Sequence, residues 1–457
     1  MNDINASTFD MGEKPVVIPI EAYVSADYAR AEGDKLWPKV WQAACRVEEI
    51  PKIGDYVTYN ILDESIIVVR TAIDKIQAFY NVCLHRGRRL TQGCGHTAQF
   101  YCRFHGWRWD LNGESAFVLA PEDWGGALNA DNLRMKQVQC DSWGGWIWVN
   151  MDPGCEPLLD YLKPASPMLD PFELDKMRYR WRQWLYFPCN WKTAMEAFIE
   201  SYHVAASHPQ LLRGGPGARF WSRAQGRHAW HGSSGPRGGD SKPMMGLAEA
   251  RGESGQEAPV AVANDLAMLW NTLNATTTET FVKAAKRLAQ ELPPGTSLAE
   301  VGGRLMAAAK QDDADRGVIW PEIDPAHMAA AGIDWHVFPN SIILPSITTA
   351  LCYRARPNGY DPNSCIFEVC VLERFPDGEE PKTEWVYQAD ASAENWRLIL
   401  SQDFQNMPEV QKGMKSRGFP GARPNPVEEI PVVHFHRNLA AYMGTGAPRP
   451  IWNRASG

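Results

Sequence analysis

The stretch that decides the fold of the first domain is residues 83–107, "CLHRGRRLTQGCGHTAQFYCRFHGW". It contains Cys83-x-His85 and, after sixteen intervening residues, Cys102-x-x-His105. Thiolate and imidazole groups are common ligands of transition metals, so two Cys/His pairs separated by a loop indicate a metal site.

Two kinds of metal site fit this pattern. Zinc is held by two Cys and two His in zinc fingers, but there Cys pairs with Cys and His with His along the chain. Here each loop supplies one Cys and one His, which favours a Rieske [2Fe–2S] centre, with two thiolates on one iron and two imidazoles on the other. Gly87 and Gly106 follow the pairs and allow tight turns that direct backbone N–H groups at the sulfides. Cys94 and His96 lie between the pairs, and we interpret them as loop residues.

The whole pattern, with Gly-Trp after the second pair, resembles the Rieske domain of Rieske-type ring-hydroxylating oxygenases. The flanking segments "DYVTYNI", "SIIVVRT" and "KIQAFYN" alternate and are rich in β-branched residues, which predicts short antiparallel strands. Asn112-Gly113 is a hairpin signal, and "WGGWIWVN" is predicted to be a closing strand. We therefore expect residues 41–156 to form an all-β Rieske [2Fe–2S] domain.

The remaining chain predicts a second, α+β domain. Residues 1–40 are expected to form a helical segment, broken by Pro38, that packs on the catalytic domain. Residues 157–457 mix strand and helix patterns, and the resemblance implies a helix-grip catalytic domain, an antiparallel sheet with helices. Residues 212–257 are rich in Gly, Ser and Arg and are predicted to be long loops. They begin a long insertion at about 212–335, whose other segments predict three helices: "AVANDLAMLWNTL", "TETFVKAAKRLAQEL" and "LAEVGGRLMAAAKQ".

Composition excludes several classes of protein. The chain has 457 residues and a formal net charge of −8, which argues against a dedicated nucleic-acid binder. We find no signal peptide in "MNDINASTFDMGEK" and no apolar run of about 18 residues that could span a bilayer. The ten cysteines are scattered, so we expect reduced thiols and a cytoplasmic location. The nineteen Trp fit either a large aromatic core or a pocket for flat apolar ligands.

A second constellation lies in residues 190–210, "NWKTAMEAFIESYHVAASHPQ". On a single helix, Glu196, Glu200 and His203 would fall on one face, while large apolar residues cover most of the rest. We expect such a helix to be buried, with its polar stripe at a metal. Pro209 disfavours helical conformation at His208, so the helix is expected to end just before it and His208 to fold back towards His203.

Two His and one carboxylate form the triad of non-haem Fe(II) oxygenases. The segment resembles the iron-binding helix of the same oxygenase family, in which N-W-K precedes E-x-Y-H-x₄-H. The carboxylate of that family lies on a helix near the C-terminus, and Asp403 in "LILSQDFQNMPEVQKGM" occupies that place. Glu409 and Glu196 are the next candidates for this role.

The resemblance implies the oxygenase component (alpha subunit) of a multicomponent system, with a [2Fe–2S] Rieske cluster on Cys83, His85, Cys102 and His105 and mononuclear Fe(II) on His203, His208 and Asp403. Electrons would come from NAD(P)H through a separate reductase, with or without a ferredoxin, since no G-x-G-x-x-G follows a predicted strand. The reaction would use O₂ to dihydroxylate or mono-oxygenate an aromatic or other bulky apolar ring compound. Oxidative demethylation, a pure electron carrier and a zinc-stabilised binding protein remain as alternatives.

The resemblance also implies assembly. Members of the family form rings of three, so we expect a homotrimer, or three alpha subunits with three small β subunits. In that family, an acid three residues before the first iron-binding His joins the iron to the cluster of the neighbouring subunit. Glu200 holds this position relative to His203, so the resemblance implies that it also contacts His105 of the neighbour.

Two features depart from the family or stand outside it. Many members have Asn where this chain has Ala197, and the 212–335 insertion overlies the expected substrate pocket, so no substrate is carried over.

We predict that His228 and His231 lie on a loop surface. His434 and His436 are predicted to serve packing or hydrogen bonding.

Overall fold

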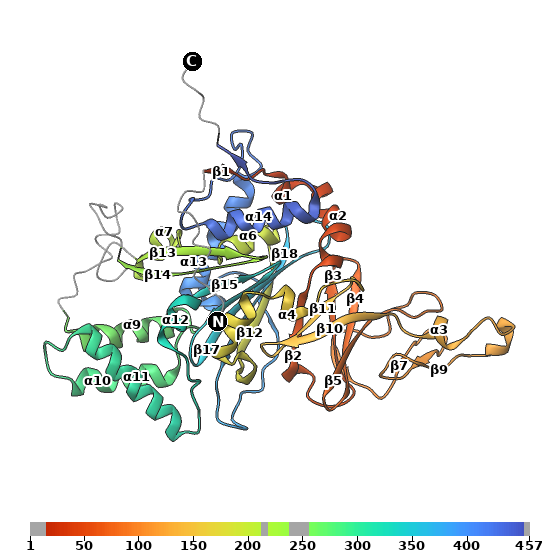
Figure 1. Cartoon of the computed structure of the whole chain (residues 1–457), viewed down its shortest axis with the longest axis horizontal. Helices are drawn as coiled ribbons and strands as arrows, with labels where there is room; N and C mark the ends of the chain where they lie inside the picture. The colour runs from red at the N-terminus through yellow and green to blue at the C-terminus, as the bar shows by residue number, and fades with distance from the viewer. Residues whose placement is uncertain (1–14, 212–217, 237–255, 452–457) are drawn as a thin grey trace, which may run out of the picture. The chain divides into compact units, whose positions relative to one another are not determined.

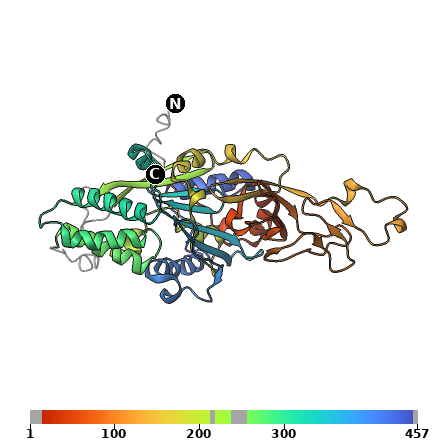
Figure 2. The same cartoon turned by 90° about the horizontal axis from the view of Figure 1, so that it is seen from below.

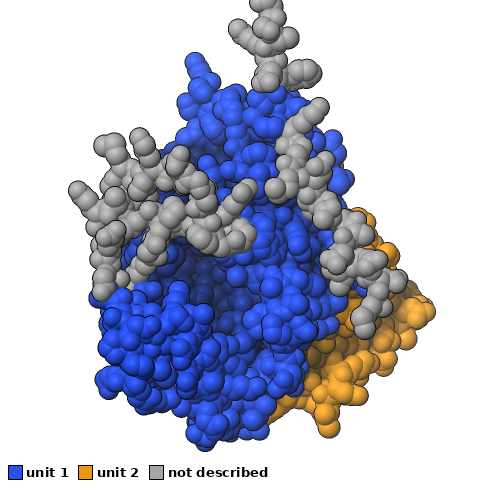
Figure 3. Space-filling view, turned by 60° about the vertical axis from the view of Figure 1, so that its left-hand side comes forward, with its two compact units in different colours: residues 1–28, 163–356, 361–457 blue, residues 29–162, 357–360 orange. Residues whose placement is uncertain are grey.

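A computed structural model of the chain describes residues 15–211, 218–236 and 256–451. The chain divides into two compact units, which Figure 3 colours blue and orange. Unit 1 comprises residues 1–28, 163–356 and 361–457, and unit 2 comprises residues 29–162 and 357–360.

Unit 2 is built mainly from antiparallel strands. Its strands are β2 (Gln42–Arg46), β3 (Asp55–Ile61), β4 (Glu64–Ala72), β5 (Lys75–Tyr80), β6 (Cys94–His96), β7 (Phe100–Tyr101), β8 (Arg108–Trp109), β9 (Ser115–Phe117), β10 (Gln137–Trp143) and β11 (Trp146–Asn150). They form a seven-stranded sheet in the order β2-β11-β10-β5-β4-β3-β6 and a three-stranded sheet β7-β8-β9. Its short helices are α3 (Ala130–Leu133) and α4 (Leu158–Tyr161). The predicted all-β domain is confirmed.

The core of unit 2 explains these strands. Residues 66–69 of β4, "IIVV", are fully buried, so both faces of this strand are covered and its alternation is lost. Gly113 has a φ of +80°, as the predicted Asn-Gly hairpin between β8 and β9 requires. Cys83 and Cys102 belong to the same apolar cluster as Phe79 and Trp109, so the two thiols lie in the core.

Unit 1 contains the larger sheet. Its strands are β12 (Arg178–Phe187), β13 (Ala218–Gln225), β14 (His228–Pro236), β15 (Asp334–Val337), β16 (Ser341–Pro345), β17 (Thr349–Pro357), β18 (Cys365–Glu373) and β19 (Val386–Tyr387). They form one eight-stranded sheet in the order β13-β14-β15-β16-β17-β18-β12-β19 (Figure 1). The short edge strand β19 runs parallel to β12, whereas β12 and β18 are antiparallel.

The helices of unit 1 complete an α+β fold, as the sequence predicts. They are α1 (Glu21–Val24), α5 (Ala165–Leu169), α6 (Trp191–Glu196), α7 (Val204–Ser207), α9 (Ala258–Thr272), α10 (Glu279–Glu291), α11 (Leu298–Asp315), α12 (Pro325–Ala331), α13 (Ala393–Gly413) and α14 (Ile430–Met443). Helix α2 (Ala26–Lys35) contains the boundary between the two units. Helix α14 packs on β13 and β14, and α6 packs on β18. None of the helices in the described part of the chain is long and apolar enough to cross a membrane.

The insertion forms its own small core. Helices α9, α10 and α11 lie side by side (green in Figures 1 and 2) and bury Ala263, Leu288 and Leu305 together with Trp320. Ser297 caps α11 by accepting a hydrogen bond from the amide of Glu300, the Ser-x-x-Glu signal of a helix start. The three predicted helices are therefore confirmed.

The predicted loop at 212–257 is wrong in part. Residues 218–236 form the antiparallel hairpin β13–β14, which adds two strands to the edge of the large sheet. Trp230 of β14 stacks on Trp335 of β15, with centroids 4.6 Å apart, so aromatic packing outweighs the high glycine and serine content. Residues 212–217 and 237–255 of the predicted loop lie outside the described residues.

The two ends of the described chain meet. Strand β1 (Val16–Val17) pairs antiparallel with β20 (Arg449–Pro450), and Ile18 forms a further bridge with Ala422. Of the predicted N-terminal segment, the described residues up to 28 thus belong to unit 1, and residues 29–40 belong to unit 2.

Candidate metal centres

Two loops of unit 2 share one backbone design. After β5, the amide of Gly87 donates to the carbonyl of Cys83 at 2.9 Å; after β7, the amide of Gly106 donates to the carbonyl of Cys102 at 2.9 Å. Both glycines have positive φ, +75° and +80°. No atom lies within 4 Å of a Cβ built on Gly87, so the conformation, and not a lack of space, requires glycine there.

The four Cys and His side chains on these loops form two like pairs. The thiols of Cys83 and Cys102 are buried and in hydrogen-bond contact, and burial, reinforced by this neighbour, raises the pKa of Cys83. The imidazoles of His85 and His105 are partly exposed, with their Nδ1 atoms 3.1 Å apart. In the described part of the chain, the four do not gather within 4.8 Å of one another, as ligands of a single ion would. A two-iron cluster with thiols at the inner iron and imidazoles at the outer one fits this separation better than a single zinc ion.

Aromatic rings surround the imidazole pair. His85 stacks on Trp107, with centroids 5.0 Å apart and planes inclined by 13°. Phe104 contacts His105, with centroids 4.0 Å apart, and is itself exposed. Arg86 lies over the Phe104 ring, so the imidazole end of the site lies at a surface with aromatic and basic side chains, whereas the thiol end lies in the core.

Cys94 and His96 do not lie in a loop as predicted. They form strand β6, which is exposed and pairs with β3. The His96 ring contacts the carboxylate of Asp55, with Nδ1 and Oδ1 2.9 Å apart. The Cys-Gly-His segment is short and polar, so the sequence alone did not indicate that it would pair with β3 and adopt a strand conformation.

The predicted single helix over residues 191–207 is wrong. Helix α6 ends at Glu196, and α7 begins only at Val204. Between them, the carboxylate of Glu200 accepts hydrogen bonds from the backbone amide of His203, at 3.1 Å, and from its ring. A side chain thus replaces the helical backbone acceptor, which sequence periodicity does not reveal.

Glu196 therefore does not form one helical stripe with Glu200, because α6 ends at Glu196. Its carboxylate accepts hydrogen bonds from the Tyr23 hydroxyl, at 3.0 Å, and from the His436 ring. The predicted hydrogen-bonding role of His436 is confirmed. The other alternative carboxylate, Glu409, is exposed and pairs with Lys412.

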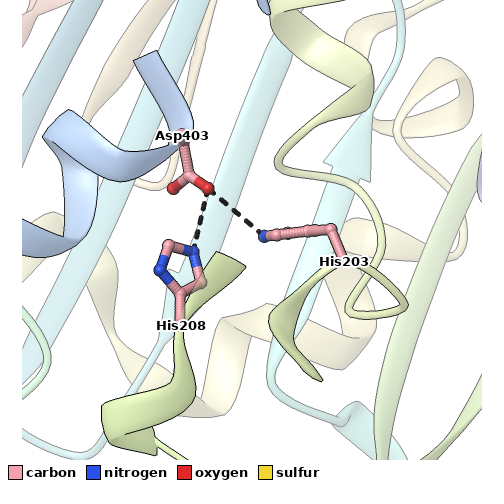
Figure 4. Close-up of side chains that lie close together, drawn as sticks. All are labelled: His203, His208 and Asp403. Atoms are coloured by element: carbon pink, nitrogen blue, oxygen red, sulfur yellow. Dashed lines mark ion pairs between the residues drawn. The ribbon is translucent and has the colours of Figure 1, made fainter. Parts of the chain in front are cut away.

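His203, His208 and Asp403 lie together in unit 1 (Figure 4). One ligand atom from each lies within 4.8 Å of the others, and among the described residues no other such group of three is found. Asp403 Oδ1 lies 2.9 Å from His208 Nε2 and 3.5 Å from His203 Nε2. His208 ends α7, as Pro209 predicts, with φ −125° and ψ 63°. Two imidazole nitrogens and one carboxylate converging on one point form a suitable set for a divalent metal.

Each imidazole of the triad is oriented by a second side chain. Glu200 Oε1 lies 2.7 Å from His203 Nδ1, and Gln402 Oε1 lies 3.0 Å from His208 Nδ1. Both rings therefore present Nε2 to Asp403. Burial alone would lower the pKa of His203, but the hydrogen bond and charge of Glu200, with the charge of Asp403, outweigh it and raise the pKa.

Gln402 was not found from sequence. It precedes Asp403 directly, and a glutamine on a helix carries no motif of its own. Its position next to the predicted ligand Asp403 was the only feature of the sequence that could have indicated a role at the site.

Helix α13 positions Asp403. Leu400, Asp403 and Met407 follow one another at helical spacing on its buried face, after a break in the helix at Arg397, so the carboxylate points into the unit. Further along the same face, the Gln411 side-chain oxygen accepts from the amide of residue 190, at the start of α6, at 3.0 Å. This contact fixes the helix that carries the carboxylate against the segment that carries the two imidazoles.

Two cavities border the triad on different sides. The first, about 320 Å³, is mainly apolar, with walls from α9, β16 and β17 that include Leu269, Leu344 and Leu351. The second, about 400 Å³, is acidic: Glu196, Glu200 and Glu429 line it. Burial, then the charges of Glu200 and Glu196, raise the pKa of Glu429 to about 7. Glu200, His203 and Asp403 touch both cavities.

The predicted loop position of His228 and His231 is wrong. Both are buried on β14, and His231 faces Asp334 of β15 across the strand pair. His231 Nε2 lies 2.7 Å from the Ser201 hydroxyl, and burial lowers its pKa to about 4. Asp334 lines the apolar cavity, and burial, with the charge of Glu200, raises its pKa well above the usual range. The segment "HAWH" does not alternate, and all four of its residues are buried, so period-two patterning gave no strand signal here.

Two family models match the chain. The model described as "Ring hydroxylating alpha subunit (catalytic domain)" matches residues 172–445, which is more than half of the chain. The model described as "Rieske [2Fe-2S] domain" matches residues 40–123.

Similar proteins of known function include mono- and dioxygenase components. The carnitine monooxygenase oxygenase subunit of Escherichia coli (strain K12) is 28% identical over 229 residues, covering 50% of this chain and 59% of that protein. The large oxygenase component of the naphthalene 1,2-dioxygenase system of Pseudomonas putida is 36% identical over 177 residues, covering 36% and 38%. The glycine betaine monooxygenase oxygenase subunit of Chromohalobacter salexigens is 36% identical over 165 residues, covering 36% and 37%. The matched stretch thus spans less than two thirds of each relative.

Solved structures share the fold. A quaternary ammonium Rieske monooxygenase in complex with L-carnitine superposes with a TM-score of 0.62 at 17% identity, covering 94% of this chain and 96% of the other. A naphthalene 1,2-dioxygenase variant bound to phenanthrene gives 0.63 at 20% identity, covering 98% and 95%. These likenesses and the family matches confirm the predicted fold class. The chain therefore belongs to the ring-hydroxylating alpha subunit family, with a Rieske [2Fe–2S] domain ahead of the catalytic domain, and this pair of domains implies a Rieske cluster and a mononuclear iron.

Proposed function

We propose that the chain is the terminal oxygenase component of a multicomponent Rieske oxygenase. The cluster is held by Cys83, His85, Cys102 and His105. The iron is held by His203, His208 and Asp403. The observation that carries the proposal is the convergence of the second set, two imidazoles and a carboxylate, beside an apolar cavity. When bound, the cluster and the iron supply the one-electron steps that activate O₂.

The side chains around the triad prepare the site for this chemistry. Glu200 and Gln402 hold the two imidazoles with Nε2 inward, which is the orientation that a metal bound with Asp403 requires. The apolar wall keeps water from the reacting centre and holds a ring compound over it. Glu200 also lines the acidic cavity.

We infer that electrons reach the iron from the cluster of a neighbouring subunit. Glu200 touches His203 and also borders the acidic cavity, so its carboxylate can serve both His203 and His105 of a neighbour. A quaternary ammonium Rieske monooxygenase of the same fold is described as using inter-subunit electron transfer. The assembly would be a homotrimer or a trimer with a small β subunit, and the electrons would come from NAD(P)H through a separate reductase, with or without a ferredoxin.

The substrate in this proposal is a bulky molecule with a largely apolar ring body. The cavity volume of about 320 Å³ is at the lower end for small-molecule sites. Its leucine-rich wall favours a ring compound, as in the naphthalene dioxygenase relative, over a small flexible cation such as the carnitine of the other relatives. This site is compatible with mono-oxygenation, including oxidative demethylation. It is equally compatible with dihydroxylation, in which both oxygen atoms are inserted.

Single-turnover chemistry tests the proposal. The reduced, iron-loaded chain is mixed with ¹⁸O₂ and a panel of ring compounds, and products are analysed by mass spectrometry. We expect substrate-dependent O₂ consumption and one or two labelled oxygen atoms in the product, which decides between mono- and dioxygenation. A visible spectrum without the red-brown absorption of a Rieske cluster would contradict the proposal and favour a zinc-stabilised protein.

A further inference from the structure

Asp334 is a buried carboxyl group with an oxygen that has no partner. Its side chain is 7% exposed and lines the apolar cavity. Across the described ranges of the chain, Oδ1 makes no hydrogen bond. Oδ2 has an imidazole nitrogen of His231 at 3.9 Å, which is too far for a hydrogen bond.

His231 does not supply a positive charge to Asp334. Its Nε2 is already engaged by the Ser201 hydroxyl, at 2.7 Å, and burial lowers its pKa to about 4, so the ring is neutral near pH 7. The other charged group that acts on Asp334 is Glu200, which repels it. The carboxyl group therefore lacks both a cation and a full set of hydrogen bonds.

The fold holds Asp334 in this place. Gly332 precedes it with a φ of +71°, and a Cβ on Gly332 would lie 2.3 Å from the backbone oxygen of His231. This close approach lets the amide of Ile333 donate to the same oxygen at 2.9 Å. Residue 334 is thus fixed opposite His231 by backbone pairing, and its side chain is fixed on the cavity side.

An unpartnered carboxyl in an apolar wall is unfavourable for the empty protein. Buried polar groups are nearly always paired, so an exception at a cavity indicates that a ligand supplies the missing partner. Leu269, Leu273, Ile333 and Leu351 line the same cavity, so most of the ligand surface meets hydrocarbon.

We propose that Asp334 determines substrate specificity by receiving one hydrogen-bond donor, a hydroxyl or amino group, from an otherwise apolar ring substrate. This inference rests on the proposed function, because it takes the apolar cavity as the substrate site. It narrows the substrate class from plain hydrocarbons to ring compounds that carry one donor group. A site built around such a bond rejects the analogue without the donor, since the carboxyl is then left unpaired.

Ligand binding to the purified full chain tests the inference without O₂ or a reductase. The probes are 2-naphthol and 2-methoxynaphthalene, which share the ring system but differ in the donor, and 2-(aminomethyl)naphthalene, which carries an ammonium group. Dissociation constants are measured by isothermal titration calorimetry under nitrogen. We expect 2-naphthol or the amine to bind at least about tenfold more tightly than the methoxy compound. A tighter amine would identify the donor as cationic, and a tighter naphthol would identify it as a hydroxyl.

Variants separate the carboxyl from the shape of the cavity. Asp334→Leu should abolish the preference or reverse it, and Asp334→Asn, which keeps one carbonyl oxygen, should retain part of it. Thr276→Val removes a different polar group from the same cavity and should leave the preference intact.

Two results would overturn the inference: equal affinities for 2-naphthol, the amine and the methoxy compound in the parent protein, or a preference that survives in Asp334→Leu. If Asp334→Leu does not fold, a preference for the donor compounds that is undiminished in Asp334→Asn has the same meaning. These readouts are independent of the proposed function. A protein that prefers the donor compounds but never consumes O₂ would contradict the oxygenase proposal alone.

Discussion

The two candidate metal centres are built in opposite ways. The Cys/His site of unit 2 comes from two short loops within residues 83–107, and each loop repeats the same backbone hydrogen bonds around a positive-φ glycine. The triad of unit 1 joins His203 and His208, after a broken helix, to Asp403 on a helix almost half the chain away. Local loop chemistry defines the first site, whereas tertiary packing defines the second. The two sites should therefore fail independently when they are perturbed.

The sharpest test of this independence is Asp403→Ala. It removes the only carboxylate of the triad, so we expect mononuclear iron and oxygenation to fall to background while the cluster spectrum in unit 2 stays unchanged. Iron analysis and visible spectroscopy on one sample measure both.

Glu409→Gln is the matched control, because this carboxylate lies on the same helix but is exposed. It should keep iron and activity. Oxygenation at the parent rate in Asp403→Ala would assign the carboxylate role to another residue.

The reverse perturbation is His105→Cys. A third thiolate makes the cluster more anionic, so we expect either no cluster or a cluster of lower reduction potential, with the mononuclear iron retained. Potentiometry followed by visible spectroscopy measures the change.

His96→Asn is the control for His105→Cys, because His96 is exposed on β6 of the same unit. Its potential should match that of the parent. An unchanged potential and spectrum in His105→Cys would show that His105 is not a ligand.

Glu200→Gln tests whether the two sites communicate. Both metals should remain, because neither set of ligands is changed, but cluster reoxidation after mixing with O₂ and substrate should slow by about 10–100-fold. Stopped-flow absorbance follows this step directly.

Glu196→Gln is the matched control, since its carboxylate lies on the same segment but bonds Tyr23 and His436. It should keep the parent rate. Reoxidation at the parent rate in Glu200→Gln, or a catalytically active monomer, would contradict the proposed path between subunits.

The smallest predicted difference between the two units is in how their stability responds to a lower pH. Unit 1 buries His231 and His336, whose pKa values are lowered by burial to about 4 and about 3, whereas unit 2 has no fully buried histidine in its described residues. Below about pH 6.5 the unfolded chain binds protons at these two histidines that the folded chain does not, so their contribution to stability falls as pH falls. Glu429 and Asp334, whose pKa values are raised in the fold, act in the opposite direction. Each buried histidine costs unit 1 on the order of 1–2 kcal/mol between pH 7 and pH 5.

Hydrogen exchange read peptide by peptide compares the two units at pH 7 and pH 5. We expect unit 1 of His336→Asn to be better protected at pH 5, relative to pH 7, than unit 1 of the parent, because one of the two destabilising histidines is gone. His96→Asn should match the parent in both units. An unchanged pH response of unit 1 in His336→Asn would contradict this assignment.

The same contrast explains what the sequence could predict. The Cys/His loops were predictable because ligand type, spacing and the glycines all lie within one short segment. His203, His208 and Asp403 were predicted from a resemblance, and their convergence in space fits that prediction. No residue pattern could show that the Glu200 carboxylate would replace helical hydrogen bonds and break the helix between Glu196 and Val204.

Other features needed the tertiary structure. Gln402 orients His208 only because α13 packs against the segment that follows α6. His231 lies opposite Asp334 because β14 pairs with β15, and the glycine-rich sequence around His231 favoured a loop. In both cases the residue acquires its role from a distant partner, which single-sequence patterns do not contain.

The pairing of β1 with β20 has a consequence for the order of folding. It joins Val17 to Arg449 and so closes a loop of roughly 430 residues with a two-residue ladder, about 3 kcal/mol less favourable in chain entropy than closing a ten-residue hairpin. So few hydrogen bonds cannot offset that loss on their own. The ladder can therefore form only after the intervening chain has collapsed, which places it among the last contacts to form and the first to open.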